Sequence, residues 1–221
     1  EETLTKAALS NEKNFNASNA GLVAIGPKTG QILAMVGSRG YFDPEIEGKV
    51  NIALANRQPG SAFKPFVYAT ALAKGYTPET ILFDLKTQFG TQCRPDDFSN
   101  EPPCYSPGNF DLKFRGPMTL REAIAQSVNI PSVKVLYLAG VTDSLKTASD
   151  MGISTLGDKN QYGLTLVLGG GEVNLLEMTS AYGIFAQDGI LHPKTSILRI
   201  ENANGIILEE KQDSAVPVLD T

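Results

Sequence analysis

Residues 57–68 read RQPGSAFKPFVY, and this stretch decides how the rest of the chain is interpreted. Ser61 and Lys64 lie three residues apart, at the start of an apolar segment that ends at Gly75. On a helix, this spacing places the hydroxyl and the amine on the same face. The sequence therefore predicts a largely buried helix over residues 61–74, with a serine and a lysine in contact at its first turn.

A serine and a lysine on one helical face can act as a nucleophile and its base. Apolar neighbours surround Lys64 in the sequence, so burial is expected to lower its pKa. The helix N-terminus would also favour negative charge on an attacking or carbonyl oxygen. An N-cap serine beside a surface lysine is the alternative interpretation, and the same spacing at Ser10 and Lys13 is read as chance.

A second pair of polar residues supports the catalytic interpretation. Ser127 and Asn129 form the only S-x-N pattern in the chain. Thr119 and Glu122 have the spacing of a capping box for a helix that ends near Ser127, and Pro131 opens the next helix. On a tight turn between the two helices, the hydroxyl can relay a proton and the amide can hold a peptide group. The alternative is an ordinary C-terminal cap.

The composition excludes several classes of protein. The single histidine, His192, argues against a Ser-His-Asp triad with histidines to spare and against a zinc site built mainly on histidines. A net charge of −5 gives no indication of nucleic-acid binding. No apolar run approaches the ~20 residues that cross a bilayer, and residues 1–19 contain no visible signal peptide. No metal or cofactor is predicted.

Two hairpins enclose a block of helices, which predicts an α+β fold. The first hairpin, 21–26 with 31–37, is nearly continuous in apolar residues and is expected to be buried on both faces. The second turns at Asn204–Gly205. The other elements expected from the pattern are helices over 131–139, 143–151 and 172–187 and strands over 196–201 and 206–210.

Residues 84–116 form a long segment in which the apolar residues follow neither a helical nor a strand-like repeat. A loop of this length is usually functional or an insertion. It contains Cys93 and Cys104. A disulfide between them would contribute about 3 kcal/mol by loop entropy if the compartment is oxidising. Two free thiols are the alternative.

Residues 57–68 resemble the nucleophile segment of bifunctional (class A) penicillin-binding proteins. Residues 25–37, 120–131 and 168–183 also match this family, so that about residues 20–210 align in order. The motif set S-x-x-K, S-D-N and K-T-G is known for these enzymes. The resemblance implies the penicillin-binding protein/serine β-lactamase-like fold, an antiparallel sheet flanked by helices, which would be incomplete in this chain.

The resemblance also implies a role for each site residue. Ser61 would be the acylated nucleophile, with its backbone N–H as one half of the oxyanion hole, and Lys64 would be its base. Ser127 would pass a proton to the leaving amine, and Asn129 would bind the amide of the substrate. The implied reaction is D,D-transpeptidation of peptidoglycan stem peptides, outside the cytoplasm, through an acyl-serine that β-lactams also form.

The third motif, K-T/S-G on a strand of the cleft, has no counterpart in a matching position. Lys28-Thr29-Gly30 lies upstream of Ser61, in the turn of the first hairpin. The expectation is that residues 20–221 are the N-terminal portion of a transpeptidase domain, completed by a further part of the same protein that carries K-T-G. Residues 1–19 are expected to be a linker from an upstream glycosyltransferase domain, and any membrane contact would be made through an N-terminal anchor outside these residues.

The sequence leaves two other functions open. The first is a non-catalytic cell-wall scaffold or binding module with the same fold. The second is a serine β-lactamase or β-lactam sensor, which would share both the fold and the nucleophile.

Overall fold

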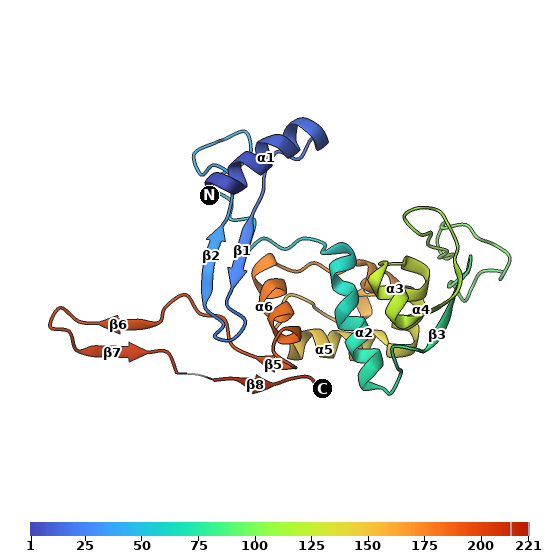
Figure 1. The fold of residues 1–221 in the computed structure, drawn as a ribbon. Coiled ribbons are helices and arrows are strands. Elements are labelled where there is room, and N and C mark those ends of the chain that lie inside the picture. Colours follow the sequence, from blue (N-terminus) through green and yellow to red (C-terminus); the bar gives the residue numbers. More distant parts are fainter. Residues whose placement is uncertain (213, 221) are drawn as a thin grey trace. The chain divides into compact units, whose positions relative to one another are not determined.

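The computed structural model describes residues 1–212 and 214–220, and its chain course is drawn in Figure 1. Contacts between its Cα atoms divide the chain into two compact units, and both are built from separate stretches of sequence. The first unit consists of Glu1–Arg57, Ala148–Leu156 and Glu172–Thr221, and the second of Gln58–Thr147 and Gly157–Gly171.

The second unit is mainly helical, and its centre is the packing of α2 (Lys64–Ala73) against α4 (Asn129–Ala139). Phe66 on α2 and Val133 and Leu136 on α4 have no exposed surface. The sequence predicts both helices, although α4 begins two residues before Pro131. These buried side chains hold together the two helices that begin with the candidate site residues Lys64 and Asn129.

The helix α3 (Leu120–Ala125) precedes α4 and starts as predicted. The Thr119 hydroxyl accepts a hydrogen bond from the backbone N–H of Glu122, and the Glu122 carboxylate accepts one from the backbone N–H of Thr119. This capping box fixes where α3 begins and therefore where the following turn lies.

The structure contains two strands in this unit that the sequence pattern does not reveal. β3 (Ile81–Asp84) pairs antiparallel with β4 (Gly116–Thr119), and Asp84 lies opposite Gly116. Both strands are only 4 residues long and β4 contains a proline, so neither shows a strand-like alternation. The pair brings together the two ends of residues 85–115, called here the β3–β4 loop. The remaining elements of the unit are η1 (Gly60–Phe63), η2 (Lys159–Gln161), η3 (Leu164–Leu168) and the start of α5 (Val141–Asp150).

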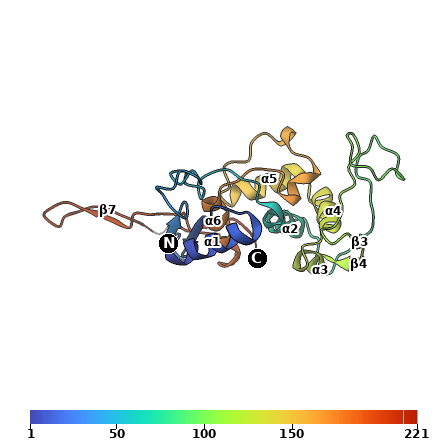
Figure 2. The same cartoon turned by 90° about the horizontal axis from the view of Figure 1, so that it is seen from above.

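The first unit is built around the predicted hairpin of β1 (Leu22–Ile25) and β2 (Ile32–Val36), against which α6 (Leu175–Phe185) packs through β1. The predicted hairpin at Asn204–Gly205 is also present, and Figures 1 and 2 show it extending from the rest of its unit. The other elements of the unit are α1 (Glu2–Phe15), β5 (Ile190–Leu191), β6 (Arg199–Glu201), β7 (Ile207–Glu210) and β8 (Val216–Pro217).

The prediction that the first hairpin is buried on both faces is wrong for this structure. Leu33 and Met35 lie on the same face of β2 and are 62% and 39% exposed. Among the described residues, β1 and β2 form a two-stranded sheet, and beyond it their backbone pairs only through the isolated bridge between Gln31 and Thr195. The residues that the structure describes in this unit therefore leave the apolar face of β2 partly exposed.

Residues 1–19, expected to be a linker, contain the helix α1. Its side chains contact the segment after β2: Glu12 forms an ion pair with Arg39, and the Thr5 hydroxyl donates to the Arg39 carbonyl. The stretch is therefore folded onto the first unit. That it follows a glycosyltransferase domain stays a prediction.

The fold class is α+β, as predicted, and each strand pair is antiparallel. The described residues hold four two-stranded sheets instead of one continuous sheet. None of the helices described is both long and apolar enough to span a membrane.

Candidate active site

Ser61 lies in η1, a single 3-10 turn that leads directly into α2. Gly60 enters the turn with a φ of 58°, in the left-handed region that glycine adopts without steric cost. A Cβ atom at Gly169, which follows η3, would lie 2.2 Å from the backbone nitrogen of Gly60. Two glycines therefore allow the backbone before Ser61 to pass close to the end of η3.

Lys64 is the first residue of α2, and its side chain points into the protein. The residue is only 1% exposed. Its Nζ atom donates to the Ser127 carbonyl oxygen at 2.6 Å, to Ser127 Oγ at 3.1 Å and to Asn129 Oδ1 at 2.9 Å. The alternative of a surface lysine is therefore wrong.

Burial lowers the pKa of Lys64 from 10.5 to about 8, because desolvation penalises the ammonium form. A lysine with this pKa is partly neutral at mildly alkaline pH, whereas a surface lysine is almost fully charged. The neutral amine carries the lone pair that a general base needs.

Ser127 lies in the turn of residues 126–128 between α3 and α4, called here the α3–α4 turn. Its φ of 53° is left-handed, which is uncommon for a residue other than glycine and costs about 1–2 kcal/mol. This backbone conformation directs the Ser127 carbonyl and hydroxyl to the same amine. Asn129 follows as the first residue of α4, so the S-x-N pattern spans the turn and the helix start.

The structure thus brings together three of the four predicted site residues, Lys64, Ser127 and Asn129. Ser61 lies one turn before Lys64, but the side-chain hydrogen bonds described for residues 1–212 and 214–220 include none from Ser61 Oγ to Lys64 Nζ. Catalytic hydrogen bonds often form only once the substrate is in place. The arrangement combines an exposed hydroxyl with a buried amine of lowered pKa, as acyl transfer by a serine requires.

Two residues of the β3–β4 loop reach this site and are not found by sequence reasoning. Asn109 Oδ1 accepts hydrogen bonds from the backbone N–H groups of Asn129 and Ile130. The Gly108 carbonyl accepts one from the Asn129 side chain. Their only sequence signal is a Pro-Gly-Asn stretch at 107–109, which reads as an ordinary turn.

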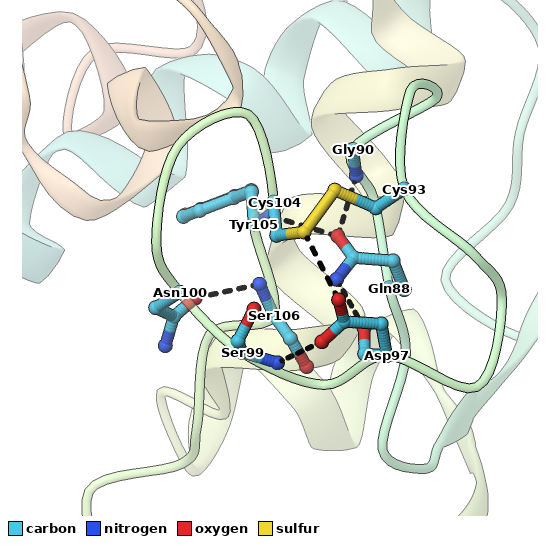
Figure 3. The surroundings of a disulfide bond; sticks show 9 residues. All are labelled: Gln88, Gly90, Cys93, Asp97, Ser99, Asn100, Cys104, Tyr105 and Ser106. Carbon is cyan, nitrogen blue, oxygen red and sulfur yellow. Dashed lines mark hydrogen bonds between the residues drawn. A yellow bond between two sulfur atoms is a disulfide. The ribbon is translucent and has the colours of Figure 1, made fainter.

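The outer part of the same loop carries the two cysteines. Cys93 and Cys104 form a disulfide with a Cα–Cα distance of 5.5 Å (Figure 3). Beside it, Gln88 Oε1 accepts from the backbone N–H groups of Gly90 and Tyr105, both at 2.7 Å. We refer to residues 88–106 as the disulfide lobe. It is closed by contacts within itself, and no hydrogen bond described for its side chains reaches Lys64 or Asn129.

Lys28-Thr29-Gly30 lies in the turn between β1 and β2. The backbone N–H groups of Thr29 and Gly30 both donate to the Gly26 carbonyl, and Gly30 has a φ of 68°. These are the features of a structural turn, as the sequence predicts.

Comparison with known proteins agrees with the resemblance found in the sequence. Residues 20–218 match the penicillin binding protein transpeptidase domain family. Penicillin-binding protein 2D of Bacillus subtilis is 33% identical over 224 residues, which cover 100% of this chain and 30% of that protein. Penicillin-binding protein 1A of Aquifex aeolicus is 35% identical over 198 residues, which cover 90% of this chain and 25% of that protein. The chain thus spans less than a third of these relatives.

Solved structures of penicillin-binding proteins share the fold. Penicillin-binding protein 1A from Haemophilus influenzae has a TM-score of 0.74 and 29% identity, over 91% of this chain and 28% of that one. PonA1 from Mycobacterium tuberculosis, solved in complex with penicillin V, has a TM-score of 0.73 at 20% identity, over 94% of this chain and 54% of that one. With the match over residues 20–218, these findings show that the chain belongs to the penicillin-binding protein transpeptidase domain family.

Proposed function

We propose that this chain supplies the nucleophile and the general base of an acyl-serine D,D-transpeptidase that cross-links peptidoglycan stem peptides. The observation that carries this proposal is the burial of Lys64, whose Nζ atom is held between Ser127 and Asn129 one turn after Ser61. Burying an amine costs free energy and lowers its pKa, and a serine enzyme that uses no histidine as its base needs such an amine.

In the proposed reaction, Ser61 Oγ attacks the carbonyl carbon of a D-Ala-D-Ala bond and transfers its proton to Lys64 Nζ. The backbone N–H of Ser61 stabilises the oxyanion. Collapse of the tetrahedral intermediate breaks the C–N bond, and Lys64 passes the proton it took, through Ser127, to the leaving D-Ala nitrogen. An amine of a second stem peptide then attacks the acyl-serine and loses a proton to Lys64. The bond between the acyl carbon and Ser61 Oγ breaks, and Oγ takes that proton back from Lys64. Asn129 holds the peptide amide during both steps. β-Lactams acylate Ser61 because they resemble the dipeptide.

We infer that a further part of the same protein completes the site and carries a K-T/S-G strand. The exposed apolar face of β2, with Leu33 and Met35, supports this inference because an uncovered face and strand edge favour aggregation. The Cys93–Cys104 disulfide supports an extracytoplasmic location, since disulfides persist in oxidising compartments. The proposed partners are therefore the stem peptides, β-lactams and this completing segment.

The test is acylation of the chain by a labelled penicillin, with the completing segment and without it, followed by mass spectrometry of the Ser61 peptide. A stable adduct that disappears in Ser61→Ala is expected. Ser10→Ala is the matched control, because Ser10 and Lys13 have the same spacing on α1. This control variant should be acylated like the wild type.

The outcomes separate the remaining functions. Absence of any adduct in the completed protein would show a non-catalytic scaffold. Rapid release of hydrolysed drug from Ser61 would show a β-lactamase. The acylation rate should also rise with pH and level off above about 8, because Lys64 must be neutral to accept the proton. A rate that does not change between pH 6 and pH 9 would remove Lys64 as the base.

A further inference from the structure

The first turn of α4 lacks a cap from its own sequence. Val128 occupies the N-cap position, and its side chain offers no hydrogen-bond acceptor. The first N–H groups of a helix have no partner within the helix and need one elsewhere. Asn109 provides it from 20 residues earlier, with Oδ1 accepting from the N–H of Asn129 at 3.1 Å and of Ile130 at 3.2 Å.

A buried carboxylate fixes the orientation of the Asn109 amide. Asn109 Nδ2 donates to both oxygens of Asp84, at 2.8 and 3.0 Å, and to the Lys113 carbonyl at 2.7 Å. Asp84 has no exposed surface and Asn109 is 4% exposed. An ionised carboxylate can only accept, so the nitrogen of the amide must face Asp84 and its oxygen must face α4. The backbone N–H and the guanidinium of Arg115 hold Asp84 in turn.

The adjacent residue, Gly108, fixes the side chain of Asn129 in the same way. Its carbonyl oxygen accepts from Asn129 Nδ2 at 3.0 Å. A carbonyl cannot donate, so the Asn129 amide must direct Oδ1 towards Lys64 Nζ, at 2.9 Å. Residues 108–109 therefore determine both the backbone and the side-chain orientation of Asn129.

We propose that Asn109, oriented by Asp84, is a positioning residue that sets the α3–α4 turn and Asn129 against Lys64. The expected effect on acylation rests on the proposed function. The hydrogen bonds by which Asn109 orients Asn129 do not depend on it. This role gives the β3–β4 loop a part in the site: the final segment of the loop caps α4, and Asp84 at the end of β3 serves as its anchor.

Asn109→Ala tests the proposal. It removes the acceptor for two N–H groups and leaves the Asp84 carboxylate without its amide partner. We expect penicillin acylation per folded molecule to fall by about tenfold to a hundredfold, since a displacement of ~1 Å at a reacting group can cost ~100-fold. Amide hydrogen exchange at Asn129 and Ile130 should become faster.

Asn100→Ala is the matched control. Asn100 lies in the same loop, and its Oδ1 also accepts a backbone N–H, that of Ser106 at 2.6 Å, within the disulfide lobe. This variant should keep the wild-type acylation rate and the wild-type amide exchange at Asn129. If both variants slow acylation equally, the loop acts through general stability and the proposal is overturned.

A reciprocal exchange provides a rescue. Asn109→Asp alone places a second carboxylate against Asp84 and should slow acylation at least as much as Asn109→Ala. Adding Asp84→Asn places an amide N–H donor at position 84 opposite the new carboxylate at position 109. That carboxylate can still accept hydrogen bonds from the first backbone N–H groups of α4. Acylation should recover at least partly in the double variant, which a loss of packing alone would not predict. A double variant no faster than Asn109→Asp would count against the proposal.

The two proposals can fail separately. If the wild-type chain, completed with its K-T/S-G segment, is not acylated, the proposed function fails. The positioning role of Asn109 can still be tested in Asn109→Ala by amide exchange at Asn129 and by the pKa of Lys64 measured by NMR. If the wild type is acylated but Asn109→Ala leaves the rate, the exchange and the Lys64 pKa unchanged, only the positioning role is wrong.

Discussion

The helices and the β3–β4 loop belong to the same unit but are held together by different interactions. α2 and α4 pack through fully buried apolar side chains such as Phe66 and Leu136. The loop exposes several of its large apolar residues, with Phe110 and Leu112 at 101% and 82% exposure. It keeps its shape through a disulfide and the hydrogen bonds around Asp84.

This difference separates two tasks. In the proposed reaction, η1 and α2 supply the groups that react, because Lys64 can be desolvated only beside a packed core. The loop supplies the orientation of Asn129, because polar contacts are directional and apolar contacts are not. Changes in the core should therefore alter how much protein is folded, and changes at 108–109 should alter how the folded protein reacts.

Lys64→Met should have the largest effect. Methionine preserves the length and apolar stem of the side chain but removes the base, so acylation should fall by about 10²–10⁴-fold. Lys13→Met, at the chance copy of the motif on α1, is the control and should leave the rate unchanged. If Lys64→Met is acylated at more than about a tenth of the wild-type rate, Lys64 is not the general base, and α2 does not supply a reacting group.

The same variant reports on stability through its pH dependence. The pKa of Lys64 is about 8 in the folded chain and near 10.5 when unfolded. Between these values the unfolded chain binds more protons, so the free energy of unfolding contributed by Lys64 rises with pH across this window. The Lys64→Met variant should lack this rise when both proteins are unfolded with urea at pH 7.5 and pH 10.

Removal of the disulfide should have a much smaller effect on acylation. Cys93→Ser with Cys104→Ser opens the disulfide lobe, and loop entropy sets an upper estimate of about 3 kcal/mol for the lost stabilisation. Because the described hydrogen bonds of the lobe do not reach Asn129, the rate should stay within about threefold of wild type. A larger loss would show that the outer and inner parts of the loop act together.

Leu136→Ala should have the smallest effect on acylation and a large effect on stability. Leu136 is completely buried on α4, so the cavity should lower the free energy of unfolding by about 2–5 kcal/mol. The folded fraction should react at nearly the wild-type rate. Tyr137→Ala, at a neighbour that is 72% exposed, is the control and should change stability by less than about 1 kcal/mol. A slow reaction in folded Leu136→Ala would contradict the division of tasks.

Local sequence patterns predicted the parts of the site that depend on neighbours in the chain. The spacing of Ser61 and Lys64 placed both on one turn, and Thr119 with Glu122 fixed the start of α3 and therefore the turn that holds Ser127. In each case the two residues lie within one helical turn of one another, so their proximity is encoded locally and can be read from spacing.

The contributions of Asp84 and Asn109 could not be predicted in this way. Their hydrogen bonds join residues that are 25 positions apart, across a loop without periodicity. The exposed face of β2 was mispredicted for a related reason: apolar composition shows that Leu33 prefers burial but not which residues would cover it. Long-range contacts follow from the tertiary fold, and the sequence pattern alone does not specify them.

The close approach of Gly169 to Gly60 has a consequence for identifying active members of the family. The backbone before Ser61 has its place only because position 169, which carries no chemistry, has no side chain; a methyl group there would lie 2.2 Å from the Gly60 nitrogen. A homologue could thus keep Ser61, Lys64, Ser127 and Asn129 and still hold this serine out of place. An inventory of catalytic motifs would count such a protein as active, whereas acylation of Gly169→Ala would show whether it is.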